Sequence, residues 1–168
     1  MDQFYSTVAQ TSFTLLALYW VLLQLRHDEW FGNPAYRRSA YDVSLYFLLP
    51  GMMSLLSLLA VSEPNVWRVS FVLFGTIGVV ESVLVMSRRG ELGAADLLVR
   101  VADVASIALY ALAILIALWR DLPDKLGLDL RPLEVEGIVL AALLGLGVVL
   151  GAAMFVSTGP HAEGGHPS

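Results

Sequence analysis

The run at residues 97–119 reads LLVRVADVASIALYALAILIALW, and only two of its residues, Arg100 and Asp103, carry a formal charge. A helix needs about 20 mostly apolar residues to cross the hydrocarbon core of a bilayer. Because this run has that length and composition, the sequence predicts a membrane-spanning helix here.

Four further runs of the same kind lie at residues 4–25, 42–61, 66–86 and 135–157. Proline usually interrupts helices, so prolines outside the runs support these boundaries. The sequence therefore predicts an all-α fold, a polytopic transmembrane bundle of about five helices that forms one domain over residues 1–158. Residues 159–168 are expected to be a disordered tail. The prolines assigned to connections or tail are Pro34, Pro64, Pro123, Pro132, Pro160 and Pro167.

Composition agrees with a lipid environment. The chain has 168 residues, of which 57% are apolar and 15% charged, against about 45–50% and about 25% in soluble domains. The net charge is −5 without a basic stripe, which argues against nucleic acid as a partner. Cysteine is absent, which excludes disulfides, thiolate catalysis and cysteine-bound metals. A single lysine among ten basic residues suggests a GC-rich bacterial genome, so we expect the bacterial cytoplasmic membrane.

Basic residues in short loops indicate the orientation, because such loops tend to remain cytoplasmic. The first predicted loop contains three arginines and the third contains two adjacent ones. These loops predict an N-terminus outside and a cytoplasmic C-terminus. The fourth loop also holds three basic residues and opposes this assignment.

Three formal charges fall clearly inside the predicted spans: Glu81, Arg100 and Asp103. At a rise of 1.5 Å per residue, Glu81 lies about 7–8 Å and Asp103 about 9 Å from the span ends that the third loop joins. Arg100 can meet Asp96 four residues earlier and Asp103 three residues later. We therefore expect these side chains to converge at one depth.

This cluster has two interpretations. It either locks the third and fourth helices together or forms a proton or cation site. More carboxylates than guanidinium groups leave negative charge, which a bound cation or a protonated carboxyl group would neutralise. Intramembrane acids often mark ion routes, but they also join helices.

A polar face follows the first predicted helix. Its members recur at spacings of three and four residues and are polar or small except at Val21. Such a face is expected to contact protein or water, either in helix packing or along a hydrated path. Tyr110 lies on the same stripe as Asp103. The candidates for a polar path are Gln10, Thr14, Gln24 and Tyr110.

Glycines mark positions where helices can approach closely. Gly75 and Gly78 share an arc with Glu81, and Gly147 and Gly151 form a GxxxG pattern. The sequence leaves open whether the last pair contacts this chain or another copy.

Pro50 and Gly51 fall inside the second predicted span, where proline tends to kink a helix. We interpret this pair as a candidate hinge. Proline-interrupted helices build binding sites in transporters but also occur without that role.

No histidine lies in a span, and no phosphate loop, dinucleotide motif or nucleophile elbow is found. We therefore expect neither an enzyme nor a cofactor nor a metal site. Two functions remain: a small proton or cation channel or transporter, and a non-transporting membrane scaffold or accessory subunit. The expected partners are the lipid bilayer and either further copies or another membrane subunit.

Overall fold

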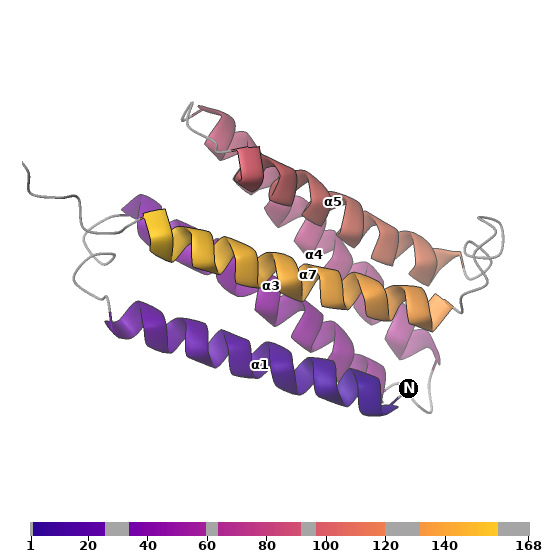
Figure 1. Cartoon of the computed structure of the whole chain (residues 1–168). Helices are drawn as coiled ribbons and strands as arrows, with labels where there is room; N and C mark the ends of the chain where they lie inside the picture. Colours follow the sequence, from indigo (N-terminus) through magenta and orange to yellow (C-terminus); the bar gives the residue numbers. More distant parts are fainter. Residues whose placement is uncertain (1, 26–33, 60–63, 92–96, 120–131, 158–168) are drawn as a thin grey trace, which may run out of the picture.

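The computed structural model describes residues 2–25, 34–59, 64–91, 97–119 and 132–157. These fold into five helices, and no strand occurs among them (Figure 1). All five are long and apolar enough to cross a membrane, so the predicted all-α bundle is confirmed for this part of the chain. Residues 159–168 lie outside the described ranges. The helices are α1 (Asp2–Leu25), α3 (Pro34–Leu59), α4 (Pro64–Glu91), α5 (Leu97–Leu118) and α7 (Pro132–Ser157).

Four helices start earlier than predicted, and three of these begin with a proline. Pro34, Pro64 and Pro132 are the first residues of α3, α4 and α7. Their assignment to connections was therefore wrong. Proline is well tolerated at the first helical position, where its missing N–H would have no partner inside the helix. The largest change is in α3, which starts at residue 34 rather than 42.

Successive helices run in alternating directions (Figure 1). The starts of α1, α4 and α7 lie at one end of the bundle, called here the N-terminal end. The starts of α3 and α5 lie at the opposite, C-terminal end. Helix α3 packs against α1, α4 and α7, whereas α1 contacts only α3 and α7. Helix α1 therefore lies at an edge of the bundle.

A layer of apolar side chains fills the bundle toward its N-terminal half. Met53 from α3, Phe71 from α4, and Leu140 and Leu143 from α7 have no exposed surface. These four residues, called here the apolar layer, belong to one continuous core. The layer lies between the polar groups at the two ends of the bundle, and buried serines adjoin it.

Helices α4 and α5 approach closely at two glycines. A Cβ atom on Gly78 would lie 2.6 Å from ring atoms of Tyr110, and one on Gly75 would lie 2.7 Å from Ile114. Side chains at these positions would overlap α5. Both glycines are therefore required for the observed separation of the two helices.

The GxxxG pattern of α7 packs inside the chain. A Cβ atom on Gly147 would lie 2.9 Å from Cβ of Tyr46 on α3. Gly151 faces Tyr19 and Val43 at an ordinary contact distance of 3.7 Å. The partner that the sequence left open is thus α3, with Tyr19 of α1.

Helix α3 continues as one helix through Pro50. Gly51 lies against α1, where its Cβ position is 3.0 Å from Cβ of Ser12. The absent side chain therefore allows α1 and α3 to pack closely. A hinge at Pro50 and Gly51 stays a prediction.

Candidate functional site

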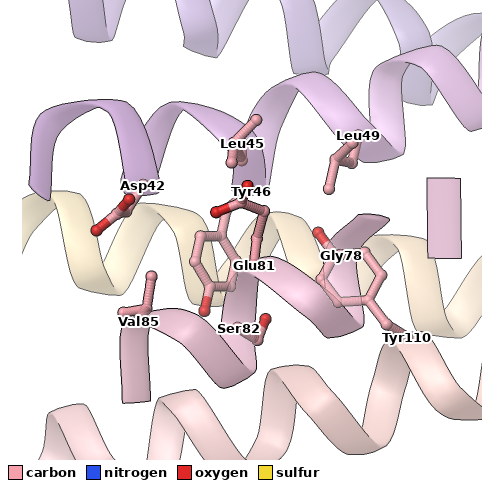
Figure 2. Close-up of a pocket in the computed structure, with 9 residues that line it drawn as sticks. All are labelled: Asp42, Leu45, Tyr46, Leu49, Gly78, Glu81, Ser82, Val85 and Tyr110. Carbon is pink, nitrogen blue, oxygen red and sulfur yellow. The ribbon is translucent and has the colours of Figure 1, made fainter. Parts of the chain in front are cut away.

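A small pocket lies between α3, α4 and α5 (Figure 2). The space that admits the centre of a water-sized sphere measures about 10 Å³, close to the minimum of about 10–15 Å³ that one water molecule requires. The pocket can therefore hold a water molecule but not an organic solute. Its lining consists of Asp42, Leu45, Tyr46, Leu49, Gly78, Glu81, Ser82, Val85 and Tyr110.

Helices α3 and α4 each contribute one face to the pocket wall. The lining positions of α3 are residues 42, 45, 46 and 49, and those of α4 are residues 78, 81, 82 and 85. Residues at such spacings share one face of a helix. Asp42 and Glu81 thereby become two half-buried acids of the same pocket. In Figure 2, Glu81 extends from α4 toward α3.

Asp42 was not among the candidate residues predicted from the sequence, because it is the first residue of the predicted span at 42–61. In the structure it lies eight residues inside α3, which begins at Pro34. The spacing of Asp42 and Tyr46, one helical turn apart, is the signal that would have placed the acid on the pocket face.

Three hydroxyl groups join the helices around the pocket. The Tyr46 hydroxyl donates to Oγ of Ser106 on α5 over 3.0 Å. Ser106 Oγ lies 3.1 Å from Ser82 Oγ on α4 and 2.8 Å from the backbone oxygen of Asp103. A serine hydroxyl has one proton and can accept others, so the direction of these bonds can switch. The group therefore forms a short hydroxyl chain across three helices.

Asp103 lies one helical turn before Ser106 of the hydroxyl chain and is 1% exposed. The Ser82–Ser106 hydrogen bond brings the turns that carry Glu81 and Asp103 next to each other. Both acids thus lie in the C-terminal half of the bundle.

Arg100 differs from these acids in burial. Its side chain is exposed, whereas Asp103 is buried and Glu81 is half-buried. Arg100 lies near the start of α5, where a long side chain can reach the polar boundary of a membrane. The grouping of these acids around Arg100 stays a prediction, and Asp96 lies outside the described ranges.

The four candidates for a polar path separate into two groups. Tyr110 is buried and lines the pocket, with its ring against Gly78. Gln10, Thr14 and Gln24 are exposed on the outside of α1. The polar face of α1 therefore does not line a path within this chain.

A second buried carboxylate was missed. Glu136 of α7 has no exposed surface, and the Trp67 indole N–H donates to its Oε2 over 3.0 Å. The buried hydroxyl of Tyr5 lies beside this pair. All three residues lie near the starts of their helices, at the N-terminal end of the bundle.

Glu136 is the second residue of the predicted span at 135–157, and only uncharged residues follow it up to position 157. An acid inside the boundary of a long apolar run, at the same end as a tryptophan, was the available signal.

The two carboxylate sites lie far apart. Trp67 and Glu81 are separated by 14 residues of α4, or about 21 Å at 1.5 Å per residue. The apolar layer lies between them. Among the described residues, no three histidine, cysteine or acidic side chains are grouped to hold a metal ion.

Comparison of the chain with protein-family models, with curated proteins and with solved structures found no match. Its function is therefore inferred from the geometry of the two carboxylate sites.

Proposed function

We propose that this chain is a small membrane channel or transporter that moves protons or monovalent cations, with Glu81 as the ion-binding carboxylate. The observation that carries the proposal is a half-buried acid in a pocket between three helices of membrane-spanning length. Ionisable groups at such positions are energetically costly and commonly belong to proton or ion pathways.

The size and lining of the pocket favour the proton. The space suffices for about one water molecule. A water molecule between Asp42 and Glu81 could pass a proton to either acid. The hydroxyl chain of Tyr46, Ser106 and Ser82 begins at the pocket wall, and each member can both donate and accept. The pocket thus contains the groups that proton transfer needs.

Transfer across the membrane also requires a second site and a change of conformation. Glu136 supplies a carboxylate at the other end of the bundle. The apolar layer lies between the two ends, and its side chains have no exposed surface. We therefore propose that a movement of this layer controls access from Glu81 to the Glu136 end.

Flux into vesicles tests the proposal. The full chain is reconstituted in phosphatidylethanolamine–phosphatidylglycerol vesicles that contain a pH-sensitive dye, and a potassium diffusion potential drives protons inward. Wild-type protein should exceed protein-free vesicles, and Glu81→Gln should reduce the rate to that background. The matched control is Glu134→Gln, which removes an acid in the first turn of α7 and should retain the wild-type rate.

Sodium and potassium fluxes are recorded in the same vesicles to separate protons from monovalent cations. Wild-type fluxes equal to those of protein-free vesicles for all three ions would exclude the proposed transport. Equal fluxes in wild type and Glu81→Gln, both above background, would exclude Glu81 as the binding group.

The alternative is a non-transporting scaffold or accessory subunit, and one observation favours it. The hydrogen bonds among Tyr46, Ser82 and Ser106 connect three helices, as polar groups do when they stabilise packing. In that case wild-type flux stays at background and Glu81→Gln lowers the free energy of unfolding. A stable variant without flux supports transport instead.

A further inference from the structure

The outer face of α1 carries a regular row of polar and small side chains. Consecutive members are separated by four and three residues in strict alternation along the whole helix. All seven positions are exposed. The row, called here the α1 seam, consists of Gln3, Thr7, Gln10, Thr14, Ala17, Val21 and Gln24.

The seam points away from the rest of the bundle. At about 100° per residue, its seven positions fall within an arc of about 100°. The buried residues Tyr5, Ser12, Tyr19 and Leu23 centre on the opposite side of the helix, about 180° away by the same rotation. Helix α1 uses that buried side to contact α3 and α7. The seam is therefore the face of α1 that is farthest from its own chain.

The chemistry of the seam differs from that of the other outer faces. Exposed positions on α4, α5 and α7 include Leu73, Val80, Val101, Val104 and Val148, which suit contact with acyl chains. The Gln10 amide does not, because Gln10 lies inside the candidate span Gln3–Leu25 and hydrocarbon offers no hydrogen-bond partner.

Hydrogen bonds within α1 satisfy only part of the seam. The Thr7 hydroxyl donates to the backbone oxygen of Gln3 over 2.8 Å. The Gln10 amide donates to Ser6 Oγ over 3.3 Å, which uses one of its two N–H groups. The remaining polar groups of the Gln10 amide therefore favour a polar surface opposite the seam.

We propose that the α1 seam is the interface of a parallel homodimer, in which α1 packs against α1 of a second copy. Copies inserted in the same orientation are related by a two-fold axis along the membrane normal, so equal residues meet at equal depth. A glutamine amide both donates and accepts, and it can therefore pair with the same residue of the other copy. The uncharged seam is self-complementary in this arrangement.

The spacing fits the same partner. Alternating steps of three and four residues generate the left-handed packing of two helices at about 20°. Thr7, Thr14 and Ala17 are small enough for close approach of the two backbones. This inference is independent of proton transfer, and it stands if Glu81 has only a structural role.

Disulfide cross-linking tests the interface, because the natural chain contains no cysteine. Single variants Thr7→Cys, Thr14→Cys and Val21→Cys are reconstituted in phosphatidylethanolamine–phosphatidylglycerol vesicles and oxidised. Each should give a covalent dimer whose yield persists after tenfold dilution with lipid. The matched controls are Val80→Cys on α4 and Val104→Cys on α5. Both positions are exposed like those of the seam but lie on apolar faces, so these variants should remain monomeric.

Equal yields at seam and control positions, or yields that fall with lipid dilution like random collisions, would overturn the homodimer. A chain that stays monomeric in vesicles at every protein density would also overturn it and would leave the seam to a different membrane subunit.

Replacement of glutamine tests the chemistry of the interface. Gln10→Leu and Gln24→Leu are compared with wild type by energy transfer between donor-labelled and acceptor-labelled copies. Because polar contacts between membrane helices contribute about 0.6 kcal/mol on average, each change should raise the dimer dissociation constant about threefold. Both side chains face away from the bundle, so the free energy of unfolding of the monomer should not fall. An unchanged dissociation constant in both variants would contradict the proposed pairing.

Discussion

Glu136 has no exposed surface, and its Oε2 accepts a hydrogen bond from the Trp67 indole over 3.0 Å. A buried carboxylate is unfavourable unless hydrogen bonds or charges compensate for its lost hydration. An intramolecular hydrogen bond contributes about 0.5–1.5 kcal/mol net, which offsets part of this cost. Trp67 thus makes burial of Glu136 tolerable and connects α4 to α7 at the N-terminal end.

The packing at Gly78 depends on a single neighbour, the ring of Tyr110. In Gly78→Ala the new methyl carbon would lie 2.6 Å from the Tyr110 ring, which is itself buried. Because the ring has little room to move, we expect a loss of about 1–3 kcal/mol in the free energy of unfolding, as for other overpacked cores. Unfolding in mixed micelles of increasing SDS content measures this loss.

The control for that measurement is Gly145→Ala on α7. No atom lies within 4 Å of the Cβ position of Gly145, so its stability should be unchanged or slightly higher, because alanine favours helices over glycine by about 1 kcal/mol. An equal loss of stability in both variants would show that contact with Tyr110 is not the cause.

At the scale of the elements, Ser106 links α5 to both of its polar neighbours. It accepts from Tyr46 of α3 over 3.0 Å and lies 3.1 Å from Ser82 Oγ of α4. Hydrogen bonds between membrane helices contribute about 0.6 kcal/mol on average and at most about 1.7 kcal/mol. Ser106→Ala removes both contacts, so we expect the free energy of unfolding to fall by about 1–2 kcal/mol.

Ser87→Ala is the matched variant, because the Ser87 hydroxyl is exposed and donates only to Leu84 O in its own helix. Its unfolding free energy should equal that of wild type. The proposed role of Ser106 in joining the helices is wrong if the two alanine variants unfold alike in the same SDS titration.

The helices themselves were predictable because each requires only a long local run of apolar residues. Helix α5 was predicted to start at residue 97 and does so. Helix α3 was predicted eight residues short because Tyr36, Arg37 and Arg38 are too polar for an apolar window. A helix can extend beyond the apolar run that defines a membrane span, and composition alone does not show where it ends.

At the scale of the whole molecule, the alternating helices place the two carboxylate sites at opposite ends. The Glu81 pocket lies toward the C-terminal end, and Glu136 lies at the N-terminal end. Because the sites are separated by the apolar layer, the direction of any transport depends on which end faces the cytoplasm.

Cysteine labelling tests the predicted orientation. The arginine-containing first and third loops should be cytoplasmic because basic loops are retained there. A membrane-impermeant maleimide should therefore label Asn65→Cys in intact cells and Ser87→Cys only after permeabilisation. Both residues are exposed and lie toward opposite ends of the bundle. The reverse pattern would place the Glu81 pocket at the outer side of the membrane.

The all-α class and the approximate limits of the five membrane-length helices follow from local composition, because length and hydrophobicity suffice for these properties in lipid. The packing of the helices was needed to show that Asp42 joins Glu81, that the Arg100 side chain is exposed and that Gly147 packs on α3. Each of these depends on how one helix is rotated against another. Since one residue turns a helix by about 100°, side chains that share a depth can face the pocket or the lipid.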